Sequence, residues 1–306
     1  MATASSIKAS EKQAICKKLT TALKKRYSSS VPKVDLPVME SLVFAACLEN
    51  ESYERAQEYY DHLLEVFHDW NEVRVSSITE LEAAFEGMED PDWRALRVRS
   101  ILQYVFEKNY VFEFEGVRKK TQDLAARHLG KIPHQSPFIV NWVMQNALDS
   151  HLVPLDDFMR DTAVALGLLE RKETAADGAE SLKAALRKAD APLFAYLLKS
   201  LSIEPKIREV VLNELDFTDE EFDPTEAAKR LEEIISAAKS GKRKKKKPVR
   251  KKKAASESDS SQKTAKKKSS SSSSKATKKS PAKKKTKATP KKKTTKKSTK
   301  TTARKK

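Results

Sequence analysis

A lysine-rich C-terminal segment divides this 306-residue chain into two parts of opposite charge. Residues 241–306 contain 30 Lys and Arg against 2 Asp and Glu, and none of them is aromatic. A segment of this composition buries too little apolar surface to offset its chain entropy, so we expect it to be disordered. Residues 1–240 carry 31 Lys and Arg against 41 Asp and Glu, and a folded body is expected only there.

Glycine and cysteine usage excludes several classes of protein. The six glycines form no G-x-G-x-x-G or G-x-x-x-x-G-K-[ST] loop, which removes most kinases and dinucleotide enzymes. Cys16 and Cys47 are too few for a disulfide framework or a four-thiolate metal site, so we expect no cofactor and a reducing compartment: cytoplasm, nucleoid or nucleus. The N-terminus lacks the apolar core of a signal peptide. The longest apolar run, residues 42–47, is shorter than the roughly 20 residues of a membrane span, so no membrane partner is expected.

Apolar residues recur with a helical period from residue 10 to residue 238, which predicts an all-α fold. Ser52 is a predicted N-cap, Ser77 and Glu80 form a predicted capping box, and only residues 110–116 have a trace of strand alternation. Besides the short helix after Ser77, helices are predicted at 11–27, 37–48, 52–69, 92–108, 117–129, 137–148, 157–169, 180–201 and 224–239.

Residues 132–157 have the pattern of two helix starts separated by a polar loop. Ser136 followed by Pro137 predicts an N-cap and a first helical residue, and Asp156 with Asp157 opens the next helix. The tight turn at 133–136 joins the helix at 117–129 to the one at 137–148. Such a turn directs backbone N–H groups at phosphate oxygens without reading sequence.

These residues resemble the helix-hairpin-helix DNA glycosylases of the endonuclease III superfamily. In that family a motif L-x-x-L-P-G-v-G-x-K-T-A-n opens the second hairpin helix, and an aspartate follows eighteen residues after the lysine. The stretch LGKIPHQSPFIVN at 129–141 takes the place of this motif without gaps, and the aspartate falls on Asp156. The agreeing positions are Leu129, Ile132, Pro133 and Asn141.

The resemblance implies a two-lobed bundle with a DNA cleft between the lobes. Residues 37–172 would form the glycosylase-like core, residues 1–36 and 173–240 would pack together as the second lobe, and residues 241–306 would be the tail. The DNA-binding residues that it implies in the body are Pro133, His134, Gln135, Ser136 and Asn141.

Three departures from the family pattern bear on chemistry. His134 and Ser136 replace the two hairpin glycines, Phe138 replaces the lysine that forms a Schiff base, and the iron–sulfur cysteines have no counterpart. A phenyl ring is no nucleophile, so no lyase reaction is expected. A monofunctional glycosylase needs only the aspartate, which stabilises the cationic sugar or activates water. Asp156 is therefore either a catalytic carboxylate or the cap of its own helix.

Residues 37–172 contain 14 Lys and Arg against 24 Asp and Glu, a poor electrostatic field for a DNA clamp. Two basic runs are either DNA-binding patches or solvated helix faces: Arg94, Arg97 and Arg99, and Arg118, Lys119 and Lys120. Phe138 and Trp142 lie at helical spacing and are expected in the core.

The tail is similar to the C-terminal domain of linker histones. Each lysine that neutralises a phosphate releases counterions, so we expect salt-sensitive binding to double-stranded DNA, with RNA as an alternative polyanion. The runs expected to bind DNA include Lys244, Lys245, Lys246, Lys283, Lys284, Lys285, Lys291, Lys292 and Lys293.

Three functions remain open from the sequence. The first is a DNA-binding protein with a catalytically degenerate base-excision-repair fold, held on DNA by its tail. The second is an active monofunctional DNA glycosylase that uses Asp156. The third is a structural nucleoid or chromatin protein whose body binds another protein.

Overall fold

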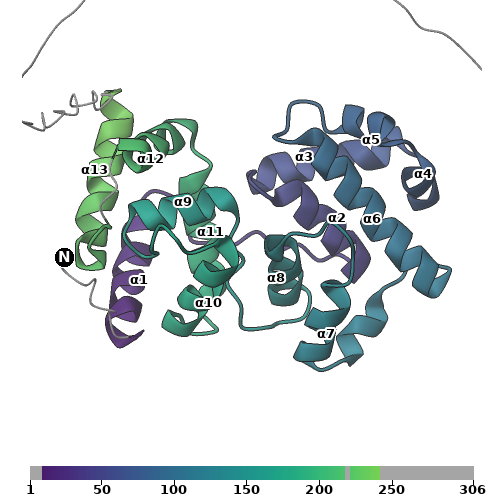
Figure 1. Cartoon of the computed structure of the whole chain (residues 1–306), viewed down its shortest axis with the longest axis horizontal. Helices are drawn as coiled ribbons and strands as arrows, with labels where there is room; N and C mark the ends of the chain where they lie inside the picture. Colours follow the sequence, from purple (N-terminus) through teal and green to yellow (C-terminus); the bar gives the residue numbers. More distant parts are fainter. Residues whose placement is uncertain (1–8, 218–220, 242–306) are drawn as a thin grey trace, which may run out of the picture. The chain divides into compact units, whose positions relative to one another are not determined.

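The computed structural model describes residues 9–217 and 221–241, and within these ranges the chain is entirely helical apart from its loops. The expected all-α fold class is confirmed. The elements are α1 (Ala9–Leu23), α2 (Val38–Leu48), α3 (Tyr53–Val66), α4 (Trp70–Val75), α5 (Ile78–Ala84), α6 (Pro91–Asn109), η1 (Glu115–Lys119), α7 (Gln122–Leu129), α8 (Pro137–Asn146), α9 (Asp157–Ala165), α10 (Ala175–Ala185), α11 (Ala191–Ser202), α12 (Pro205–Phe217), η2 (Pro224–Glu226) and α13 (Ala227–Ser240) (Figure 1).

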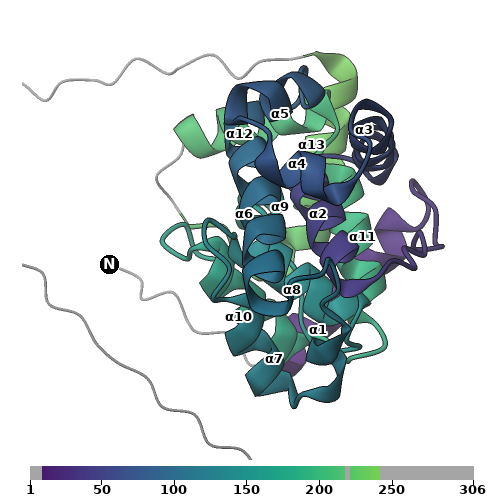
Figure 2. The ribbon, with the colours of Figure 1, turned by 90° about the vertical axis from the view of Figure 1, so that its right-hand side faces the viewer.

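Helices α2 to α8 form one group around the apolar helix α2. Ten of the eleven residues of α2 are buried, because α3, α6 and α8 all pack against it. Trp142 of α8 stacks at 5.5 Å between ring centroids on Phe44 of α2. Helix α6 runs along this group with α5 near one end and α7 near the other (Figure 2).

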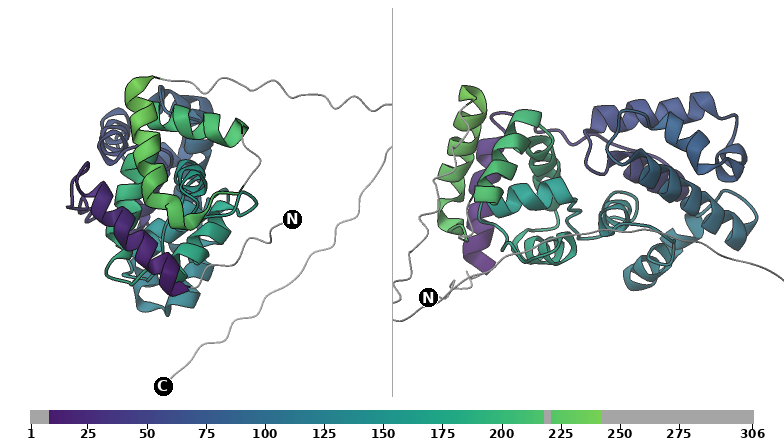
Figure 3. Two further views of the ribbon diagram at one scale, coloured as in Figure 1. Left: turned by 90° about the vertical axis from the view of Figure 1, so that its left-hand side faces the viewer. Right: turned by 45° about the horizontal axis from the view of Figure 1, so that its top comes forward.

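Helices α1 and α9 to α13 form the second group. The N-terminal helix α1 packs on α10, α11 and α13, and α9 packs on α11 and α12 (Figures 1 and 3). Cys16, Leu19 and Leu23 are the buried residues on the inner face of α1. Residues from both ends of the folded part therefore share one core.

Local start signals agree with the sequence prediction. The hydroxyls of Ser52 and Ser136 accept the backbone N–H groups of Arg55 and Ile139, and Ser77 and Glu80 make both bonds of a capping box. Phe138 and Trp142 are buried, as expected for core residues.

Several predicted boundaries are wrong. The helix predicted at 180–201 is two helices, because Leu186 has extended backbone and Pro192 starts α11 anew. The helix predicted at 52–69 ends at Val66, where Phe67 turns to extended backbone. The helix predicted from 117 begins at Gln122, after a 3₁₀ turn. Helices α4 and α12 were not predicted, and residues 110–116 form no strand.

No helix in the described ranges has the length and apolar character needed to cross a bilayer.

The expectations for the tail, which include disorder and the DNA-binding lysines from Lys244 to Lys293, concern residues 241–306. Of these, all except Gly241 lie outside the described residues.

Candidate nucleic-acid interface and the closed aspartate site

The hairpin between α7 and α8 keeps a left-handed residue where the resembling family has glycine. His134 has φ of 62°, a left-handed conformation that is uncommon in residues other than glycine, although Asn, Asp and His adopt it more often than most. Pro133 and His134 are exposed, and Gln135 and Ser136 are half-buried. The backbone turn therefore forms without either glycine.

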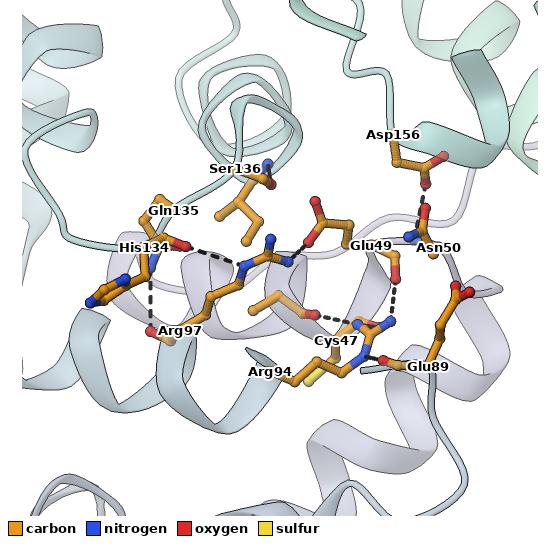
Figure 4. A network of polar contacts seen from close by, with 12 residues as sticks. Cys47, Glu49, Asn50, Glu89, Arg94, Arg97, His134, Gln135, Ser136 and Asp156 are labelled. Atoms are coloured by element: carbon orange, nitrogen blue, oxygen red, sulfur yellow. Dashed lines mark hydrogen bonds and ion pairs between the residues drawn. The ribbon is translucent and has the colours of Figure 1, made fainter. Parts of the chain in front are cut away.

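Arg97 of α6 is hydrogen-bonded to this turn (Figure 4). Its guanidinium donates to the carbonyl of His134 at 3.2 Å and forms an ion pair with Glu49. Gln135 in return donates its side-chain amide to the carbonyl of Arg97 at 3.3 Å. The ring of Trp93 lies 6.1 Å from that of His134. These contacts explain how a histidine is held in the left-handed region.

The amides at the start of α8 are free to bind an anion. Within the described residues, the backbone N–H groups of Gln135, Ser136 and Phe138 have no acceptor. The helix dipole adds partial positive charge at the same place. Partial burial, together with the positive charges of Lys120 and Lys131, lowers the pKa of His128 on α7, so this imidazole is less readily protonated. Lys131 lies two residues before Pro133 of the hairpin and is exposed.

Asp156 caps α9 and is closed off from solvent. One carboxylate oxygen accepts the N–H of Met159 at 2.9 Å, and the other accepts the N–H of Asn50 at 3.0 Å. Figure 4 shows the bond to Asn50, which comes from the loop after α2. The side chain of Asp156 is 0% exposed. The neighbouring Asp157 is exposed at the residue level, and partial burial together with Asp156 and Asp161 raises its pKa.

Lys199 of α11 completes the surroundings of Asp156. Its ammonium lies 2.5 Å from the carboxylate, and its side chain is 4% exposed. The same nitrogen is 4.9 Å from the centre of the Phe138 ring. Burial lowers the pKa of Lys199, and the carboxylate of Asp156 opposes that shift. The amine of Lys199, which is carried by α11 of the second group of helices, therefore lies close to Phe138 of α8.

The hollow around these residues is nearly filled. It is lined by Tyr53, Phe138, Trp142 and Lys199 among others, and its volume is about 10 Å³. This is room for about one water molecule. The indole of Trp142 donates to the hydroxyl of Tyr53 at 3.1 Å, and the Tyr53 ring packs against Tyr196 of α11. A nucleobase does not fit here without movement of these side chains.

The two basic runs have different places. Arg94 is only 3% exposed, and its guanidinium donates to the carbonyls of Ala46, Cys47, Glu49 and Glu89. Its role is therefore to stabilise the C-terminal end of α2. It belongs neither to a DNA-binding patch nor to a solvated helix face. Arg118, Lys119 and Lys120 are exposed. Asn141 is half-buried on α8.

Sequence reasoning did not single out Lys199. The signal was present: in APLFAYLLKSLS, Lys199 stands at a position where the helical period requires an apolar side chain, one residue after buried Leu198. Among the described residues, no group of three or more His, Cys, Asp and Glu side chains is placed to hold a metal ion.

Comparison with protein-family models gives no match, and neither does comparison with curated proteins. Solved structures of endonuclease III with DNA are similar to this chain. A trapped covalent endonuclease III–DNA intermediate, in an estranged-adenine complex, matches with a TM-score of 0.49 and 12% identity over 63% of this chain and 85% of that one. A non-covalent endonuclease III–DNA complex matches with a TM-score of 0.49 and 14% identity over 61% and 84%. Both are likenesses of fold.

Proposed function

We propose that this chain is a DNA-binding protein that grips duplex phosphates and does not excise bases. The hairpin supports the first half of this proposal, since His134 keeps the turn that frees the amides of Gln135 and Ser136. Lys131, two residues before Pro133, adds an exposed positive charge beside it. The lysine-rich tail supplies the remaining, sequence-independent affinity and suits a nucleoid or nuclear location.

The ion pair between Asp156 and Lys199 is the observation that carries the second half. A catalytic carboxylate needs access to the developing sugar cation or to an attacking water. Asp156 instead has each oxygen occupied, and the hollow beside it has a volume of about 10 Å³. This arrangement supports a structural role for Asp156 over the monofunctional glycosylase hypothesis.

Binding and base release would be measured on the same protein. The substrates are a 30-base-pair duplex, the same duplex with one abasic-site analogue, and duplexes that carry one deaminated, oxidised or alkylated base. We expect salt-sensitive binding to all duplexes and no released base. A chain that ends at Pro248, which keeps every described helix, should bind more weakly than the full chain.

Two variants separate the alternatives. Base release that disappears in an Asp156→Asn protein that still binds the duplex, and persists in the neighbouring Asp157→Asn, would establish the glycosylase instead. If the full chain binds none of the duplexes at low salt, or binds RNA much more tightly, the DNA-binding proposal is wrong. Condensation of long DNA without any preference for damage would place the protein among structural nucleoid proteins.

A further inference from the structure

A groove of about 450 Å³ lies between α1 and the residues that lead into α11. Lys17 and Lys24 line it from α1 and the turn that follows, and Arg187 lines it from the opposite side. All three side chains are exposed, and none forms an ion pair within the part of the chain that the structure describes. Asp190 is the one acidic residue in the lining.

This groove is basic, although residues 1–240 as a whole carry a net negative charge. Residues 1–240 are acidic overall, with 41 Asp and Glu against 31 Lys and Arg. Residues 9–26 reverse this balance, with six Lys and Arg against the single carboxylate of Glu11. The basic residues are therefore gathered on this helix and the turn that follows it, and do not simply reflect composition. Such a gathering creates a local positive potential that attracts a polyanion.

The spacing suits the backbone of a nucleic acid. Lys17 and Lys24 are seven residues apart, which is two helical turns and roughly 10 Å along one face of α1. Successive phosphates of one strand advance by about 3.4 Å along the duplex axis, so two ammonium groups at this separation can reach different phosphates of the same duplex. No aromatic residue lines the groove, and it offers no surface on which unpaired bases would stack.

A second hollow that contains basic residues lies near the chain segment that borders the groove. Next to Arg187, Lys188 forms an ion pair of 2.6 Å with Asp149. Asp149 lines a hollow of about 290 Å³ together with Arg118 and Lys120. The ion pair thus connects the residue after Arg187 to a hollow lined by two basic residues that precede α7.

We infer that the α1 groove is a second DNA site, in which Lys17, Lys24 and Arg187 hold the phosphate backbone of a duplex. This inference rests on the proposed DNA binding and names a contact surface outside the hairpin. Phosphate contacts of this kind position the protein without reading sequence.

Lysine protection in the full chain tests the inference directly. The protein is acetylated with and without a 30-base-pair duplex, and the modification of each lysine is measured by mass spectrometry. We expect at least threefold protection of Lys17 and Lys24. Lys108, exposed on α6 and part of neither hollow, is the internal control and should react equally in both samples.

A paired set of variants gives an independent readout. Lys17→Gln with Lys24→Gln should reduce the slope of log affinity against log salt by about 2, because each phosphate contact contributes about 0.9. Lys108→Gln with Lys172→Gln removes the same charge elsewhere on the surface and should leave the slope unchanged.

The outcomes separate this inference from the proposed function. Protection of Lys131 and the tail lysines without protection of Lys17 and Lys24 overturns the groove site and leaves DNA binding intact. Equal slopes for the two double variants also overturn it. Protection of Lys17 and Lys24 by polyglutamate but not by DNA assigns the groove to acidic polypeptides and overturns it too. Absence of any DNA binding removes both proposals.

Discussion

The ammonium of Lys199 lies 2.5 Å from the carboxylate of Asp156, and α11 and α9 bring the two side chains together in an almost solvent-free position. Two ions that leave water lose hydration energy, which their attraction offsets only when the remaining hydrogen-bond positions are also filled. Here the N–H groups of Asn50 and Met159 each donate a hydrogen bond to the carboxylate, and the Phe138 ring lies beside the ammonium. The pair therefore links the loop after α2, in the first group of helices, to both α9 and α11.

Removal of either ion should destabilise the protein strongly. Lys199→Met leaves Asp156 as an uncompensated buried carboxylate, and Asp156→Asn leaves the ammonium without its counterion. We expect each change to lower the free energy of unfolding by about 3–5 kcal/mol. The double variant should lose clearly less than the sum of the two, because the unpaired ion is then absent. Urea denaturation of the four proteins measures this, and additive losses would contradict the coupling.

Arg94 should be as important for stability as the ion pair. It donates to carbonyls at the end of α2, and Arg94→Met leaves several of these buried acceptors without a donor. At about 1–3 kcal/mol for each unsatisfied group, we expect a loss of at least 3 kcal/mol. Arg99→Met, on the same helix and without an ion pair among the described residues, should change the unfolding free energy by less than about 1 kcal/mol.

Replacement of His134 tests the hairpin conformation. Its φ of 62° is strained for histidine and more so for a β-branched residue. His134→Gly should be neutral or stabilising by up to about 1 kcal/mol, and His134→Val should destabilise by about 1–2 kcal/mol. DNA binding by the chain that ends at Pro248 should survive the first change and weaken with the second. Equal stability of the two variants would contradict the left-handed turn.

The N-cap Ser136 should affect both stability and DNA binding. Ser136→Ala removes the acceptor for Ile139 and is expected to cost about 1 kcal/mol. It should also loosen the turn that we propose to bind phosphate, so we expect DNA affinity to fall in the chain that ends at Pro248. Ser77→Ala breaks a comparable cap on α5, far along the sequence from the hairpin, and should lose stability alone. Equal affinities for both variants would exclude the hairpin from the interface.

These caps also show what the sequence predicts well. Ser52, Ser77, Ser136 and Asp156 act on amides three residues away, so the pattern that reveals them is local. The ion pair was beyond such reasoning because Lys199 is 43 residues from Asp156 and on a different helix. The break at Leu186 was missed since no glycine marks it, although Pro192 was a usable signal. Arg94 was read as a surface residue, because sequence does not reveal which carbonyls a helix end leaves open.

Alkaline pH should weaken the fold through the buried thiols. Burial raises the pKa of Cys16 to about 11 and that of Cys47 to about 12, from 9.0 in the unfolded chain. Above about pH 9 the unfolded state loses thiol protons that the folded state keeps, so stability falls as the pH rises toward 11. Each thiol contributes up to about 1.4 kcal/mol per pH unit. Cys16→Ala should show a shallower decline than the unaltered protein in denaturation series from about pH 8.5 to 10.5.

The exit point of the tail has a further consequence. Helix α13 ends at Gly241 and packs along α1, the helix that carries the basic groove (Figure 3). The lysines after Gly241 are therefore tethered to the same group of helices as Lys17 and Lys24. If both sets of lysines bind DNA as proposed, a duplex held by one set would meet the other as an intramolecular partner, at an effective concentration set by the tether. The protein would then dissociate slowly from DNA, although each phosphate contact is weak. Individual contacts would break and re-form often along the DNA.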